Sequence, residues 1–284
     1  MSRLWNRITT YSRFVKIEHT LFSFPLLLSG AVIAEGTLTP KVILLVLIAG
    51  TGARVAALGL NRIFDRVIDR ENPRTADREL PSNQMTLREA ILVTGSGISV
   101  YLLAALLISP SCLWYAPIPL AIFFIYPLMK RFTIWAHLGV GASLAMAPLG
   151  SWYAVQLSFN NYAQITLLCL FTLFWVAGFD IIYAILDVEF DREYGIHSLP
   201  ASLGKKRALW VSLFFHLIAF SSLLTLYSLF MQGELAFVML VTVGSLFAIE
   251  HWKAADVEFA FFKVNAAIGF AIFLFTLTGK GIFG

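Results

Sequence analysis

Long apolar stretches alternate with short polar segments along most of the chain. Because a helix of about 20 apolar residues spans the hydrocarbon core of a bilayer, each long stretch predicts a membrane-spanning helix. We predict nine such helices, near residues 20–35, 42–60, 90–109, 112–129, 134–155, 163–186, 208–231, 234–250 and 264–282. The pattern therefore predicts an all-α, polytopic membrane protein, with its helices bundled into a single membrane-embedded domain over residues 1–284.

The composition agrees with this pattern. Hydrophobic residues make up 58% of the chain and charged residues 13%, whereas soluble domains carry about 25% charged residues. Residues 1–20 mix basic and apolar side chains, which is typical of a segment lying in the membrane interface. Both cysteines, Cys112 and Cys169, lie at or within apolar stretches and indicate buried thiols rather than a disulfide framework.

Basic residues are distributed unevenly between the loops. With a cytoplasmic N-terminus, eighteen of the 21 Lys and Arg residues fall in cytoplasmic segments, Lys41 and Lys280 fall outside, and Arg54 falls within the second predicted span. This asymmetry is the usual signature of orientation in a membrane. The net charge of +4 is thus explained by topology, and it does not indicate nucleic-acid binding.

The second predicted span ends in three polar side chains spaced four residues apart, Asn61, Asp65 and Asp69. This spacing places them along one face of a helix. Carboxylates so placed repel each other and lose hydration near the bilayer, which a divalent cation would relieve. Oxygen ligands of this kind suit Mg²⁺. The alternative is a solvated helix end where the acids pair with neighbouring arginines, namely Arg62, Arg66 and Arg70.

A second copy of this motif follows 122 residues later. Tyr183, Asp187 and Asp191 repeat the four-residue spacing at the end of another apolar run, and residues 197–201 align with residues 78–82 in the loops that follow. We therefore predict an internal repeat, at about residues 42–89 and 165–207, of an acidic helix end followed by a basic loop. Two such units facing each other would form one polar pocket.

The pocket has the charges that a diphosphate needs. Divalent cations held by the acids, together with basic side chains, would neutralise the negative charge on a leaving diphosphate. A substrate with a diphosphate head and a long hydrocarbon tail would place the tail among the apolar helices, and a polyprenyl diphosphate has this shape. The loops supply the basic side chains Arg70, Arg74, Arg78, Arg192 and Lys205.

The motifs resemble those of the UbiA superfamily of intramembrane aromatic prenyltransferases. The resemblance implies a nine-helix bundle, two Mg²⁺ ions held by both Asp motifs, and transfer of a prenyl group to an aromatic ring. It is carried by Asn61-x3-Asp65-x3-Asp69, Pro73-Arg74-Thr75-x2-Arg78, Tyr126-Pro127-x2-Lys130-Arg131, and Asp187-x3-Asp191 with Asp180, Tyr183, Gly195 and Ser198 around it.

Within that superfamily the chain looks most like the 4-hydroxybenzoate polyprenyltransferases. This implies an aromatic acid as acceptor and a role in quinone biosynthesis at the inner membrane. The distribution of basic residues predicts that both acidic motifs lie on the cytoplasmic side. Residues 16–25 resemble bacterial members that serve menaquinone synthesis, with 1,4-dihydroxy-6-naphthoate as the acceptor. The sequence Arg78-Glu79-Leu80-Pro81 departs from the Arg-Pro-Leu of many hydroxybenzoate enzymes. Both acceptors therefore remain open.

The resemblance and the spacing together assign roles to sixteen residues. Arg54, within a span, is a candidate partner for a carboxylate or diphosphate, and Tyr126 and Tyr183 are candidates for cation–π contact with an allylic cation. The metal ligands are predicted to be Asn61, Asp65, Asp69, Asp187 and Asp191, and the catalytic residues to be those four Asp residues with Tyr183. Predicted substrate-binding residues are Arg54, Asn61, Arg70, Arg74, Arg78, Tyr126, Lys130, Asp180, Arg192, Ser198 and Lys205.

A cation-coupled transporter would also combine buried acids with an internal repeat, but its site is expected near the bilayer midplane. Here the acids cluster at helix ends on one side, which favours a catalytic pocket. His137, His216 and His251 have no spacing typical of zinc ligands. His19 is a candidate hydrogen-bond partner of the acceptor, and Asn265 is a candidate for tying two helices together.

Overall fold

The computed structural model describes residues 2–16, 20–254, 256 and 263–281, so His19 lies outside the described residues. All regular elements in this part of the chain are helices. They are α1 (Ser2–Phe14), α2 (Thr20–Ile33), α3 (Pro40–Glu71), α4 (Leu87–Ile108), α5 (Pro110–Tyr115), α6 (Pro117–Met129), α7 (Ala136–Gln156), α8 (Ala163–Ala184), the 3₁₀ helix η2 (Ile185–Asp187), α9 (Val188–Tyr194), α10 (Leu199–Leu203), α11 (Lys205–Phe230), α12 (Glu234–Trp252) and α13 (Asn265–Gly279).

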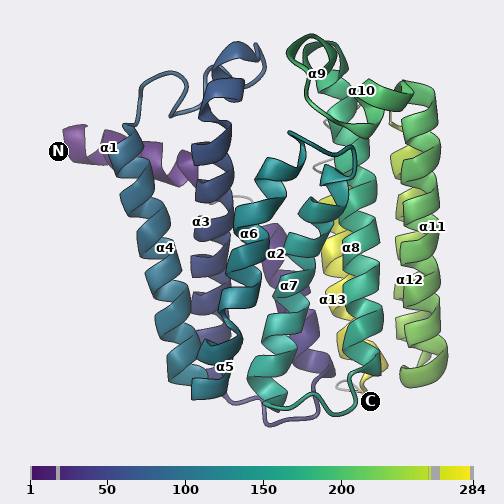
Figure 1. Ribbon diagram of the computed structural model, residues 1–284. Coiled ribbons are helices and arrows are strands. Elements are labelled where there is room, and N and C mark those ends of the chain that lie inside the picture. Colours follow the sequence, from purple (N-terminus) through teal and green to yellow (C-terminus); the bar gives the residue numbers. More distant parts are fainter. Residues whose placement is uncertain (1, 17–19, 255, 257–262, 282–284) are drawn as a thin grey trace.

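The long helices stand side by side as a bundle, and α1 lies across it near one end (Figure 1). Among the described residues, seven helical segments are long and apolar enough to cross a membrane, and Ser23–Ile33 and Asn265–Gly279 are shorter apolar helices. Each of the nine predicted spans therefore falls on an apolar helical segment. Large apolar side chains such as Trp114, Trp210 and Leu229 are exposed on the outside, as expected for a multi-pass membrane protein facing lipid.

Local sequence signals explain where the helices of the first half begin. Thr39 accepts a hydrogen bond from the Val42 amide, and Pro40 occupies the first turn of α3, where its missing N–H costs nothing. Thr86 and Glu89 form a reciprocal capping box at the start of α4. The capping box at Thr86 thus ends the loop, residues 72–86, that follows the first acidic motif.

Small residues bring the motif-bearing helices close to their neighbours. A Cβ atom added at Gly52 of α3 would lie 2.7 Å from the Gly97 carbonyl oxygen of α4, and one added at Gly141 of α7 would clash with the Leu173 carbonyl of α8. Such close backbone approach is the usual way that helices associate in lipid. The packing therefore positions α3 and α8 through their partners α4 and α7.

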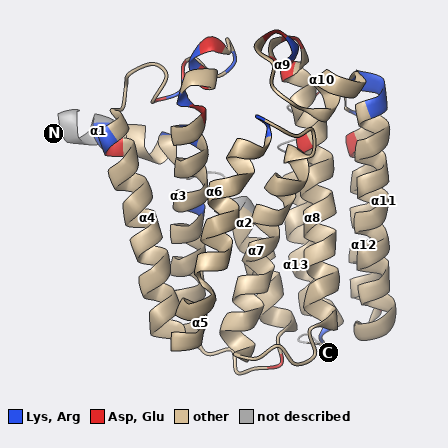
Figure 2. Cartoon of the chain, in the orientation of Figure 1, with Lys and Arg blue, Asp and Glu red and all other residues tan. Residues whose placement is uncertain are grey.

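Charged residues gather at one end of the bundle (Figure 2). This end carries the loop after α3 together with α9 and α10 (Figure 1). Helix α1 joins it through Phe14, which is fully buried in a cluster with Leu80, Met85 and Ala90. The segment predicted to lie at the interface thus packs against the loop of the first motif.

Candidate active site

A cavity of about 220 Å³ opens at the charged end of the bundle and brings the two halves of the repeat together. Its wall is formed by α3, the 72–86 loop, the end of α6, the start of α7, and the segment from the end of α8 to α10. Twelve of the sixteen predicted site residues line it: Asn61, Asp65, Asp69, Arg74, Arg78, Tyr126, Lys130, Asp180, Tyr183, Asp187, Asp191 and Ser198.

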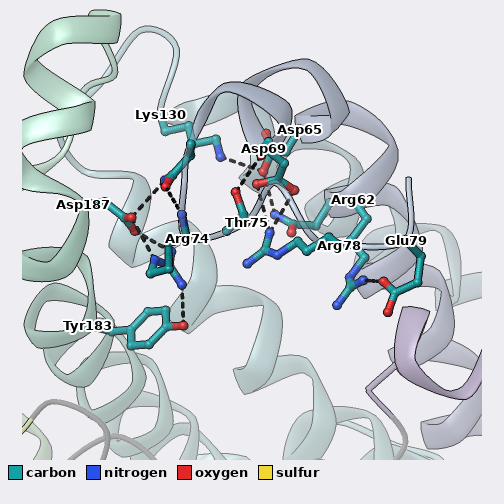
Figure 3. Close-up of polar contacts among 12 residues, drawn as sticks. Arg62, Asp65, Asp69, Arg74, Thr75, Arg78, Glu79, Lys130, Tyr183 and Asp187 are labelled. Carbon is teal, nitrogen blue, oxygen red and sulfur yellow. Dashed lines mark hydrogen bonds and ion pairs between the residues drawn. The ribbon is translucent and has the colours of Figure 1, made fainter. Parts of the chain in front are cut away.

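The first motif lies on an unbroken helix, as its spacing predicts. Asn61, Asp65 and Asp69 all belong to α3, and both carboxylates are buried. Lys130 donates a hydrogen bond of 2.6 Å to Asp65, and Arg78 donates one of 2.8 Å to Asp69 (Figure 3). Each acid is therefore held by a cation from outside its own helix.

The second motif also lies at the end of a long helix, but there the helix is interrupted by a 3₁₀ turn. Helix α8 ends at Ala184, Ile185–Asp187 forms a 3₁₀ turn, and α9 begins at Val188. The Ile185 amide bonds the Ile182 carbonyl in the tighter i→i−3 pattern, which rotates the following side chains relative to a regular α-helix. Tyr183, Asp187 and Asp191 all line the cavity despite this interruption.

Arg74 connects the two halves. Its Nε donates to Asp187 over 2.8 Å and its Nη1 to the Tyr183 hydroxyl over 2.6 Å (Figure 3). The guanidinium carbon also lies 4.8 Å from the centre of the Tyr183 ring. Burial opposes the charge of Arg74, but the hydrogen bonds to Asp187 and the nearby negative groups of Tyr183, Asp187 and Asp69 together outweigh it and raise the pKa of Arg74. Asn72 donates a further bond of 2.9 Å to Asp187.

The remaining acids of the second half are held by Ser198 and His137. Ser198 donates a hydrogen bond of 2.7 Å to Asp191 and also caps α10 by accepting from the Ala201 amide. Asp180, one helical turn before Tyr183, lies 2.6 Å from Nδ1 of His137. Sequence reasoning gave His137 and Asn72 no role in the site, because the motif that each joins lies far away in the chain.

Four predicted site residues do not line the cavity. Arg54 lies two helical turns before Asn61, where its Nη1 is 3.5 Å from the Ser23 hydroxyl. Its Nε is buried and has no hydrogen-bond partner among the residues that the structure describes. Arg192 donates to the Ala201 carbonyl. Arg70 and Lys205 are exposed at the surface. A substrate confined to the cavity would therefore not contact these four residues directly, and their predicted role in substrate binding stays a prediction.

The alternative pairing of the acids with neighbouring arginines is not what the structure shows. Arg62 instead forms a buried ion pair with Glu79 (Figure 3). Its guanidinium also lies over the Phe14 ring. Arg66 donates to the Ile63 carbonyl. Arg62 and Arg66 are thus engaged elsewhere. Asp65 accepts from Asn61 of the same helix and from Lys130 at the end of α6, and Asp69 accepts from Arg78 of the loop.

The acids offer suitable oxygen ligands for a hard divalent cation. Asp65 Oδ1 is buried and has no hydrogen-bond partner within the described part of the chain, which costs free energy unless a cation or donor contacts it. Among the described residues, no three His, Cys, Asp or Glu side chains converge into a ready metal cluster. This arrangement fits Mg²⁺, which retains waters and is usually held by one or two carboxylates plus substrate oxygens.

Comparison with known sequences identifies the family. The model of the UbiA prenyltransferase family matches residues 22–258. A polyprenyl transferase of Arthrobotrys oligospora is 33% identical over 198 residues, 66% of this chain and 54% of that protein, so the chain spans about half the length of that relative. A 4-hydroxybenzoate octaprenyltransferase of Pseudomonas entomophila is 27% identical over 281 residues, which cover 96% of this chain and 92% of that protein.

Solved structures have the same architecture. The apo structure of a UbiA homolog from Aeropyrum pernix K1 superimposes with a TM-score of 0.85 at 33% identity, covering 90% of this chain and 96% of that one. A UbiA homolog from Archaeoglobus fulgidus bound to GPP and Mg²⁺ gives a TM-score of 0.69 at 17% identity over 93% of this chain and 99% of that one, which shows a common fold. With a family model matching most of its length and both acidic motifs meeting in one cavity, this chain belongs to the UbiA prenyltransferase family.

Proposed function

We propose that this protein transfers a polyprenyl group from polyprenyl diphosphate to the ring of an aromatic acid, with 4-hydroxybenzoate as the acceptor, in quinone biosynthesis. One observation carries the proposal: two acidic motifs from distant parts of the chain line a single cavity together with Arg74, Arg78 and Lys130. This combination of acids and cations suits a diphosphate held through divalent metal.

The diphosphate would bind at the mouth of the cavity. Asn61, Asp65, Asp69, Asp187 and Asp191 would hold Mg²⁺, and the bound ion would supply positive charge against the negative charge that grows on the leaving diphosphate. The three cations of the wall add fixed positive charge in the same place, where it stabilises the transition state more than the ground state. The relatives support this proposal, since an Archaeoglobus fulgidus homolog binds GPP and Mg²⁺.

The acceptor would bind deeper, toward Arg54. The buried Nε of this residue is a hydrogen-bond donor suited to a carboxylate. Positive charge also accumulates on this side of the motif, since burial and the nearby charges of Arg78, Arg62, Arg74 and Arg54 lower the pKa of Lys16 to about 8. An aromatic carboxylate would stabilise this group of cations.

The naphthoate acceptor is the second candidate. The observation that favours it is Glu79, which replaces the proline of many hydroxybenzoate enzymes and forms a buried ion pair with Arg62 beside the motif. An assay that offers 4-hydroxybenzoate, 1,4-dihydroxy-6-naphthoate and homogentisate with one polyprenyl diphosphate separates the candidates. If the naphthoate is preferred, it replaces 4-hydroxybenzoate as the proposed acceptor. Metal-dependent ion flux without any prenylated product would indicate a transporter instead.

Arg54→Ala tests the acceptor position. Loss of a charge-assisted hydrogen bond of about 1.5–3 kcal/mol should raise the KM of the acceptor roughly ten- to a hundredfold, while the KM of the prenyl diphosphate stays unchanged. Arg66→Ala is a matched control, because Arg66 is an exposed arginine of the same helix. A defect confined to the prenyl diphosphate KM would place Arg54 at the diphosphate.

The location of the site is part of the proposal. We place the protein in the inner membrane, with the cavity on the cytoplasmic side, because of the strong bias of basic residues to one end. Ser82→Cys and Ser202→Cys, each in a variant lacking Cys112 and Cys169, introduce exposed thiols in the two loops. An impermeant thiol reagent should label both in inverted vesicles and neither in right-side-out vesicles.

A further inference from the structure

His137 and Asp180 form a hydrogen-bonded pair on the wall of the cavity. His137 comes from the first turn of α7 and Asp180 from the last turns of α8, and Nδ1 lies 2.6 Å from Oδ2. The histidine side chain is only 5% exposed, whereas that of Asp180 is 26% exposed. The imidazole is therefore enclosed behind the carboxylate, and the carboxylate reaches the cavity.

The surroundings of His137 determine which ring nitrogen carries the proton. The Leu199 amide, at the start of α10, donates a hydrogen bond of 3.3 Å to Nε2. A nitrogen that accepts a hydrogen bond has its lone pair available and no proton, so the proton of the neutral ring is on Nδ1. His137 consequently donates to Asp180 Oδ2 and fixes the plane of that carboxylate.

Asp180 also differs from the other acids of the cavity in its partner. Asp65, Asp69 and Asp187 each contact a Lys or Arg side chain, and Asp191 accepts from Ser198. Within the described part of the chain, Asp180 forms its hydrogen bond with a neutral imidazole. Asp180 is also not one of the proposed metal ligands, so its carboxylate can act as a base toward the substrate ring rather than hold a cation.

Aromatic substitution requires such a base. Once the ring has bonded to the prenyl carbon, it is cationic and carries a hydrogen at the same ring carbon. That C–H bond must break, its electron pair must return to the ring, and the proton must pass to an acceptor.

We propose that His137 is a positioning residue that orients Asp180 as the base receiving this ring proton. The inference rests on the proposed function, because it needs an aromatic acceptor. The carboxylate becomes a carboxylic acid, the ring becomes neutral, and the diphosphate has already departed, so atoms and charges balance. His137 keeps its own proton and holds the Asp180 carboxylate throughout.

The test uses acceptor deuterated at the ring position that is prenylated. In the parent protein we expect kcat to be nearly insensitive to deuterium, because cation formation limits the rate. His137→Leu removes the donor, and we expect kcat to fall roughly a hundredfold with a primary isotope effect clearly above one, while both KM values change little. Asp180→Asn should have the same signature.

His137→Asn is the matched variant, since its side-chain amide can donate from nearly the place of Nδ1. It should recover much of the rate and suppress the isotope effect, and it keeps the test informative if His137→Leu does not fold. A slow variant without an isotope effect, or no recovery in His137→Asn, would overturn the inference. Failure of the parent protein to prenylate any acceptor would instead defeat the proposed function.

Discussion

The two acidic motifs share a spacing but not a local structure. The first lies on the continuous α3, which ends at Glu71 and is followed by Pro73. The second lies on a chain that breaks at η2, resumes as α9 and ends at Gly195 in the left-handed region, with a φ of 70°. Pro73 and Gly195 occupy equivalent positions in the repeat, and they end the helix by different means: proline cannot continue it, and glycine reverses it.

The loops after the motifs are also stabilised differently. Glu79 aligns with Ser198 in the repeat, and Glu79 forms a buried ion pair with Arg62, whereas Ser198 caps α10 and bonds Asp191. The first loop is thus held by charge and by packing under α1, and the second by backbone capping. The four-residue spacing therefore identifies the acids that can reach the cavity. The hydrogen-bond partner of each acid then determines where its carboxylate lies.

The largest effect is expected from removing the acids of either half. Asp65→Asn,Asp69→Asn and Asp187→Asn,Asp191→Asn should each lower kcat/KM for prenyl transfer more than about 10³-fold, because one lost electrostatic contact to a leaving group costs roughly 10²–10³-fold. EDTA should abolish turnover by the parent protein and Mg²⁺ should restore it. Near-normal turnover by one double variant would show that the site belongs to the other half alone.

The next effect concerns stability and should be confined to the first half. Arg62→Met or Glu79→Leu alone leaves a buried charge unpaired and should lower the free energy of unfolding in mixed micelles by about 3–5 kcal/mol. The double variant Arg62→Met,Glu79→Leu should recover most of this loss, because both charges are then gone. Arg7→Ala is the control, since Arg7 is largely exposed in its pair with Glu89 and its loss should change the free energy of unfolding little.

A smaller loss of activity is expected from removing one arginine of the cavity. Its accompanying change in hydrogen exchange should distinguish Arg74, which connects the two halves, from Arg78, which contacts Asp69 of the first half. Arg74→Ala removes the bonds to Asp187 and Tyr183, and we expect kcat/KM to fall roughly ten- to a hundredfold. Amide hydrogen exchange should rise in residues 185–204. Arg78→Ala, the matched variant, should lower activity similarly but raise exchange in residues 65–82. The same exchange pattern in both variants would contradict the distinction.

The smallest effect is expected at the end of α9. Gly195→Ala places a Cβ atom at positive φ and should destabilise the protein by about 1 kcal/mol, with no clash to add to the cost. Gly150→Ala, within α7 and also in open space, should instead stabilise by roughly 0.5–1 kcal/mol. Thermal unfolding in detergent would measure both, and equal shifts in one direction would refute the conformational argument.

Much of the fold could be predicted from the sequence because the bilayer restricts the alternatives. Apolar segments of about 20 residues have to cross as helices, and each of the nine predicted ranges coincides with an apolar helical segment. The site could be predicted in part for the same kind of reason. Asp65 and Asp69 lie on one helix, where spacing translates directly into direction, whereas Asp187 and Asp191 lie across a break that spacing does not reveal.

The sequence by itself determined the membrane-spanning pattern, the uneven charge of the two ends and the identity of the acids, because hydropathy, charge and spacing are properties of the chain alone. Only the tertiary structure decided which cation meets which acid. Lys130 is 65 residues from Asp65, Arg74 is 113 residues from Asp187, and His137 is 43 residues from Asp180. These pairs depend on how helices pack and where α8 breaks, and a hydrogen bond depends on ångström distances that sequence separation does not encode.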